Sequence, residues 1–141
     1  MELKEFLYKA KKAAIDYETT DSESDEFSIR KGELDYVHKN IGGRVVETVS
    51  HKKLVVWTMA SHPAILTEDI NKKIFYVFLR RALNKMPCES PLRGPDFFRD
   101  SEWEYTNHLW GKVDRSFDGV ERVTFDNLEI FSNPYKGGII R

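Results

Sequence analysis

Hydrophobic residues recur at helical spacing in two stretches of the chain. In the first, apolar positions occur every three or four residues from Leu3 to Tyr17, and lysines occupy mostly the other faces. The second follows Thr67, a good helix N-cap with two acidic residues after it, and runs to about Met86, just before Pro87. Its expected core positions are Ile70, Ile74, Val77, Phe78, Ala82 and Leu83, with Phe75 and Leu79 widening the stripe. The pattern predicts two helices that each bury one side.

Segments rich in β-formers, partly with alternating polarity, make two sets of three predicted strands. The first set is residues 33–41, 44–50 and 54–60, and the second is residues 102–110, 112–125 and 128–135. Gly42-Gly43 and Asp126-Asn127 provide turns within these sets. The order is therefore α-βββ-α-βββ. It predicts an α+β fold in which two helices pack on an antiparallel sheet, within a single domain of residues 1–141.

Two connecting segments differ in character. Residues 19–26 are polar and acidic, which is typical of a solvated loop. Residues 87–101 form a longer connection with three prolines and one glycine. Connections of this length are uncommon inside compact domains and are often functional or tightly packed.

The two strand sets share residues at matching positions, which suggests an internal duplication of residues 33–60 and 102–135. Three positions recur 69 residues later: Glu33, Tyr36 and Gly42 match Glu102, Tyr105 and Gly111. Five more recur 74 residues later: Val46, Glu47, Val49, Leu54 and Trp57 match Val120, Glu121, Val123, Leu128 and Phe131. A duplicated unit would have a central seam, and a ligand could bind there.

Composition narrows the functional class. The formal net charge is −1, which argues against direct nucleic-acid binding, and 40% of the residues are hydrophobic, which argues against disorder. The only cysteine is Cys88, so neither an internal disulfide nor a cysteine metal cluster is expected. The sequence contains neither an apolar run long enough to span a bilayer nor a signal peptide. We therefore expect a cytoplasmic protein without membrane association.

Short motifs along most of the chain resemble an uncharacterised bacterial family that is known only as a domain of unknown function. The matching segments are residues 1–7, 56–59, 78–83, 92–95, 105–111, 117–121 and 135–138. Members of that family occur alone or behind a helix-turn-helix regulator domain. The resemblance implies no activity. It implies only that an effector-sensing or interaction role is plausible by analogy.

Glu47 and Glu121 are the most notable candidate residues. Strand alternation places each carboxylate on the same face as apolar neighbours, so both are expected to be at least partly buried at matching positions. Buried carboxylates have raised pKa values or strong partners, and such groups concentrate at functional sites. A structural salt bridge is the alternative interpretation.

Arg93, in the long connection, could bind an anionic ligand or could anchor its own loop through one of these glutamates, and we favour anchoring. Tyr36, Tyr105 and Trp110 are further candidates for lining a ligand pocket. The four histidines lack the spacing of metal ligands, so no metal and no cofactor are expected.

The sequence contains no complete catalytic set. Its leading interpretation is a non-enzymatic module that binds a small molecule of effector type. One alternative is a small enzyme that uses Glu47 or Glu121 as general acid–base, and another is a protein-interaction module. Self-association into a homo-oligomer stays open.

Overall fold

The computed structural model describes residues 3–20 and 24–140. It contains helix α1 (Leu3–Glu18), helix α2 (Lys72–Leu83) and nine strands. The strands are β1 (Glu26–Lys31), β2 (Leu34–Ile41), β3 (Arg44–His51), β4 (Leu54–Ser61), β5 (Ala64–Ile65), β6 (Phe97–Asp100), β7 (Trp103–Gly111), β8 (Ser116–Phe125) and β9 (Leu128–Ile139).

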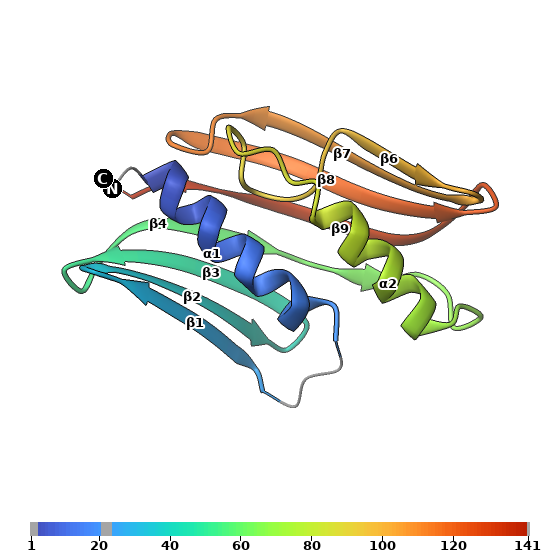
Figure 1. The fold of residues 1–141 in the computed structure, drawn as a ribbon, viewed down its shortest axis with the longest axis horizontal. Helices are drawn as coiled ribbons and strands as arrows, with labels where there is room; N and C mark the ends of the chain where they lie inside the picture. The colour runs from blue at the N-terminus through green and yellow to red at the C-terminus, as the bar shows by residue number, and fades with distance from the viewer. Residues whose placement is uncertain (1–2, 21–23, 141) are drawn as a thin grey trace.

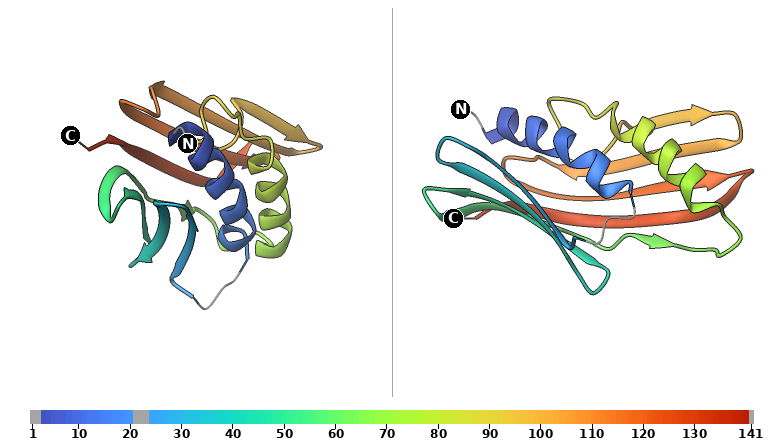
Figure 2. Two further views of the ribbon diagram at one scale, coloured as in Figure 1. Left: turned by 60° about the vertical axis from the view of Figure 1, so that its left-hand side comes forward. Right: turned by 60° about the horizontal axis from the view of Figure 1, so that its bottom comes forward.

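All strands join one antiparallel sheet in the order β1-β2-β3-β4-β9-β8-β7-β6, and β5 pairs with β9. Both helices lie on the same face of this sheet, side by side, as Figures 1 and 2 show. The α+β class, with two helices on an antiparallel sheet, is therefore confirmed. Among the described strands, β4 and β5 join the two halves of the sheet by pairing with β9.

The sheet has three strands more than the sequence predicted. Strand β6 lies inside the segment read as a connection, where it pairs with β7, and β5 is a two-residue strand on β9. Strand β1 begins at the end of the expected acidic loop, whose residues 21–23 lie outside the described residues. Five of the six residues of β1 are exposed, because it is an edge strand. A strand without a buried face carries no alternating signal, which is why the pattern missed it.

Helix α2 is shorter than predicted and starts at a different cap. Asn71 is the N-cap: its side chain accepts hydrogen bonds from the backbone N–H groups of Lys73 and Ile74. Thr67 instead accepts a hydrogen bond from the backbone N–H of Asp69, so it stabilises a turn before the helix. The buried positions are Phe75, Phe78, Leu79, Ala82 and Leu83, whereas Ile74 and Val77, predicted to face the core, are exposed. The buried face is thus rotated toward Phe75 and Leu79.

Each helix covers its own part of the core. Phe6, Leu7, Ala10 and Ala14 of α1 pack in one cluster with Tyr36, Val49, Trp57, Met59, Leu92, Val113, Phe117 and Tyr135. The buried residues of α2 pack in a second cluster with Ile15, Tyr105, Val123, Ile130 and Phe131. Neither helix in residues 3–20 and 24–140 combines the length and apolar character that a membrane crossing requires.

Candidate functional site

The first half of the sheet holds a buried carboxylate with two donors. Glu47 on β3 accepts a hydrogen bond from the hydroxyl of Tyr36 on β2 and one from Lys11 Nζ on α1, at 2.5 Å. Tyr36 faces inward because it alternates along β2 with exposed or half-buried neighbours. Lys11 lies on the buried stripe of α1, and its side chain is 1% exposed. Glu47 therefore ties the helix to the sheet.

This environment sets the protonation states of the pair. Burial alone would raise the pKa of Glu47, but the charges of Lys11 and His38 and the hydrogen bonds from Lys11 and Tyr36 outweigh it and lower that pKa to about 2. Burial, together with the adjacent carboxylate, raises the pKa of the Tyr36 hydroxyl well above its ordinary value. Glu47 is thus an anion at neutral pH, and Tyr36 stays protonated as its donor.

The second half of the sheet holds a similar arrangement around Glu121 on β8. Tyr105 on β7 donates to Glu121 Oε2 at 2.5 Å, and Arg93 Nε donates to Oε1 at 2.7 Å. Asn133 Nδ2 on β9 also donates to Oε1, at 2.7 Å. Glu121 is fully buried, and Arg93 is only 7% exposed. The expectations that Glu121 is buried and that Arg93 anchors its loop through a glutamate are both confirmed.

Further hydrogen bonds hold the loop that carries Arg93. Gly94 N–H donates to the Tyr105 hydroxyl at 2.9 Å, and Asn107 Nδ2 donates to the Gly94 carbonyl at 3.1 Å. Asn107 Oδ1 accepts from the Tyr135 hydroxyl at 2.7 Å. The ring of Tyr135 packs directly over Gly119, where an added Cβ would lie 2.3 Å from it. The room beside Gly119 is thus filled by this ring, so it offers no space for a ligand.

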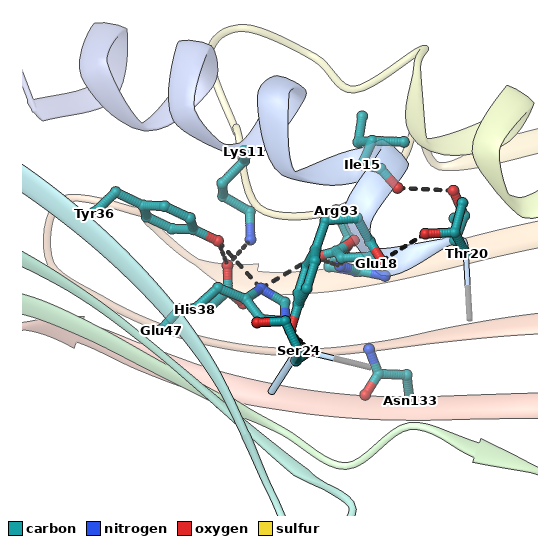
Figure 3. A network of polar contacts seen from close by, with 12 residues as sticks. Lys11, Ile15, Glu18, Thr20, Ser24, Tyr36, His38, Glu47, Arg93 and Asn133 are labelled. Atoms are coloured by element: carbon teal, nitrogen blue, oxygen red, sulfur yellow. Dashed lines mark hydrogen bonds and ion pairs between the residues drawn. The ribbon is translucent and has the colours of Figure 1, made fainter. Parts of the chain in front are cut away.

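Glu18, the last residue of α1, connects the two halves (Figure 3). Arg93 Nη1 lies 3.2 and 3.0 Å from its two carboxylate oxygens. His38 Nδ1 lies 3.5 Å from Glu18 Oε1 and 3.4 Å from the Tyr36 hydroxyl. Burial on its own lowers the pKa of Arg93, but Glu121 and Glu18 raise it well above its ordinary value. Arg93 therefore stays charged between two carboxylates.

A pocket of about 440 Å³ opens beside this network, between the end of α1, the start of α2 and the sheet. Glu18, His38, Arg93 and Asn133 contribute polar groups to its wall. Its apolar part includes Val45, Pro63, Ile65, Phe75, Leu79 and Phe131, from strands β3, β5 and β9, helix α2 and the segment between β4 and β5. The pocket therefore joins an apolar surface to the open end of the buried ion network.

The structure brings five of the six predicted site residues into one network and separates the sixth. The five are Tyr36, Glu47, Arg93, Tyr105 and Glu121. Only Arg93 among them lines the pocket, while the other four lie behind its wall. Trp110 lies near the end of β7, 61% exposed and outside the pocket, with its ring stacked on His108.

Sequence reasoning missed four residues whose side chains contact the five network residues directly: Lys11, Glu18, His38 and Asn133. A signal existed for His38, because it lies two residues after Tyr36 on the same strand and therefore on the same face. For Asn133, the signal was its place in the predicted repeat. It matches Met59, 74 residues earlier, which lies two residues after Trp57 on the same strand. Lys11 and Glu18 follow helical spacing, but nothing local indicates that they face inward.

Glu18, His38 and Glu47 place three potential metal-ligand atoms within 4.8 Å of one another. All three residues already have partners: Lys11 and Tyr36 donate to Glu47, Arg93 donates to Glu18, and His38 Nδ1 lies 3.4 Å from the Tyr36 hydroxyl. A divalent cation would have to compete with these buried positive charges, so the arrangement suits an ion-pair network better than a metal centre.

Comparison with known protein families matches residues 40–140 to a family described as Domain of unknown function (DUF5680). The matched part includes Arg93, Tyr105, Glu121 and Asn133, whereas Lys11, Glu18, Tyr36 and His38 precede it. Comparisons with curated proteins and with solved structures give no match. Because the matched residues span well over half of its length, the chain belongs to the DUF5680 family.

Proposed function

We propose that this protein is a non-enzymatic module that binds a small molecule of effector type in the pocket between α1, α2 and the sheet. The pocket of about 440 Å³ is the observation that carries the proposal. Pockets for small molecules typically measure about 300–1,000 Å³ and combine apolar walls with a few placed polar groups. Phe75, Leu79 and Phe131 supply such a wall here, and Glu18, Arg93 and Asn133 supply the polar groups.

The rigidity of the polar wall supports this function. Glu18 and Arg93 hold each other, and Arg93 is held in turn by the buried Glu121. Groups fixed in this way need little ordering when a ligand arrives, which favours affinity. The enzyme hypothesis receives less support, because Glu47 and Glu121 are at most 1% exposed and neither lines the pocket. A general acid–base has to reach the substrate proton directly or through one water.

We also infer an internal duplication of residues 33–60 and 102–135. The pairing of β4 and β5 with β9 supports it: a shift by 74 positions converts the pair Trp57–Ile139 into the pair Phe131–Ile65. Each half also has a register shift at the matching place, between Val49 and Ser50 and between Val123 and Thr124. The duplication requires the two units to superpose with Glu47 on Glu121.

A thermal-shift screen against a metabolite library tests the binding function, because a ligand that binds only the native state raises the melting temperature. The matched variant is Ala64→Trp, which places a large ring at the pocket wall on the short strand β5. Val55→Trp is the control, on an exposed position of β4 outside the pocket. Compounds that stabilise the wild type and Val55→Trp should not stabilise Ala64→Trp. A screen without hits, or hits that Ala64→Trp retains, would refute the proposal.

A further inference from the structure

The buried network contains more carboxylates than cations. With His38 in its neutral form, Lys11 and Arg93 bring two positive charges, whereas Glu18, Glu47 and Glu121 bring three negative ones. Tyr36 and Tyr105 do not alter this balance, since burial raises the pKa of both hydroxyls and keeps them neutral. Lys11 pairs with Glu47, and Arg93 pairs with both Glu121 and Glu18. Glu18 therefore shares its cation with a second carboxylate. The surplus negative charge therefore lies at Glu18, in the pocket wall.

A second acceptor in the same wall has no partner. Asn133 is 2% exposed, and its Oδ1 accepts no hydrogen bond within the described part of the chain. Its amide orientation is fixed, because Nδ2 donates to Glu121 Oε1 and a flipped amide would place two acceptor oxygens against each other. A buried acceptor without a donor costs roughly 1–3 kcal/mol. Two residues of the wall can thus accept from a further donor: Glu18 carries the surplus charge, and Asn133 holds a buried carbonyl oxygen without a hydrogen bond.

We propose that the pocket binds a small molecule with a protonated amine, whose N–H groups donate to Glu18 and to Asn133 Oδ1. This inference rests on the proposed binding function and names its ligand class. An ammonium group would neutralise the surplus charge and satisfy the orphan acceptor at once. The apolar part of the ligand would contact Phe75, Leu79 and Phe131, and aromatic rings are favourable neighbours for a cation.

The other charged groups around the site leave room for this ligand. Besides Arg93, His38 in its protonated form would compete for Glu18, because its Nδ1 lies 3.5 Å from Oε1. Asp25 and Lys72 are exposed residues of the rim and carry opposite charges. An anionic ligand would meet the Glu18 carboxylate and the Asn133 carbonyl, both of which repel it. Of the three Arg93 side-chain nitrogens, Nε and Nη1 already donate to carboxylates, which leaves Nη2 for an anion.

The test compares three probes of the same shape and different charge: benzylamine, benzyl alcohol and benzoate. Dissociation constants come from titrations of the ¹⁵N-labelled chain, in which the Asn133 side-chain amide reports contact directly. Benzylamine should bind about tenfold or more tightly than benzyl alcohol, as a charge-assisted hydrogen bond would provide, and benzoate should bind most weakly. Benzylamine should also shift the Asn133 amide signal.

Glu18→Gln should remove the preference for benzylamine, whereas Glu5→Gln should keep it. Glu5 is the matched control because it lies on the same helix, changes the net charge equally and is exposed. Equal binding of the three probes, or tighter binding of benzoate, would overturn the amine inference and leave the binding function standing. If the metabolite screen gives hits but benzylamine does not bind, the amine inference is likewise wrong and the binding function still stands. A Zn²⁺ complex that blocks benzylamine and is lost in His38→Gln would assign the site to a metal and overturn the inference too. Failure of both the probes and the metabolite screen would refute the binding function itself.

Discussion

At the scale of residues, the fold depends on buried charges that are paired. Lys11 and Arg93 come from a helix and a loop, while Glu47 and Glu121 come from strands, so each pair ties a separate element to the sheet. Replacing both residues of a buried ion pair by apolar residues often leaves stability unchanged. Removing only one partner lowers stability, because the other charge stays buried without compensation. The network therefore specifies how the elements dock more than it adds net stability.

Lys11→Met tests this role in the first half of the sheet. The substitution keeps the apolar stem and removes Nζ, which leaves Glu47 buried without its cation. The free energy of unfolding should fall by about 3–5 kcal/mol at neutral pH. Lys9→Met is the control, because Lys9 is exposed and its pair with Glu5, across one helical turn, is exposed as well. It should change stability by less than about 0.5 kcal/mol. Urea denaturation measures both; equal effects would contradict the structural role of Lys11.

At acidic pH, the free energies of unfolding of the wild type and Lys11→Met should become more similar. In the wild type, Lys11 and its neighbours outweigh burial and lower the pKa of Glu47 from 4.5 to about 2. The resulting stability, on the order of 3 kcal/mol, is complete above pH 4.5 and is lost as the pH falls toward 2. In the variant, which lacks Lys11, burial raises this pKa. Acid therefore protonates Glu47 and removes the uncompensated buried charge. Urea denaturation across this pH range should show a narrowing difference, and a constant difference would contradict the assignment.

The sequence predicted one half of the network and missed the other for a physical reason. Strand alternation indicated that Glu47 and Glu121 point inward, and the predicted repeat matched Tyr36 to Tyr105, which the structure places beside these two glutamates. The remaining partners come from distant parts of the chain: Lys11 is 36 residues before Glu47, and Glu18 is 75 residues before Arg93. Local periodicity contains no information on such contacts.

At the scale of elements, the start of α2 decides the shape of the pocket. Lys72, Phe75 and Tyr76, in the first turns of the helix, line it. The sequence placed the helix start at Thr67, because that residue and the two acidic residues after it form a good capping pattern. The structure uses Asn71, whose side chain accepts hydrogen bonds from the backbone N–H groups of Lys73 and Ile74.

Alanine substitutions at the two candidate caps distinguish these helix starts. Asn71→Ala removes an acceptor of two backbone N–H groups, at 3.0 and 3.2 Å, and should lower the free energy of unfolding by about 1 kcal/mol. Thr67→Ala removes a single hydrogen bond in an exposed turn and should have a smaller effect. Chemical denaturation of both variants provides the comparison, and a larger effect at Thr67 would support the earlier helix start.

At the scale of the whole molecule, the pocket results from the way two sheet halves and two helices meet. Periodicity predicted two helices and six of the nine strands but not that β4 and β9 would pair, because pairing between distant strands depends on tertiary packing. The two helices lie side by side on one face of the joined sheet (Figure 2). The pocket lies between the end of α1, the start of α2 and the sheet. A site at this junction could not be deduced from either strand set alone.

Mapping backbone amide shifts in the ¹⁵N-labelled protein, on titration with the strongest hit of the metabolite screen, tests this location most directly. The perturbed residues should cluster around the pocket, at Gly43, Ser61, Ile65, Phe131 and Asn133. The exposed ends of β7 and β9, represented by Trp110 and Leu128, should not respond. Perturbations confined to the sheet edges or to the face without helices would contradict a binding site between α1, α2 and the sheet.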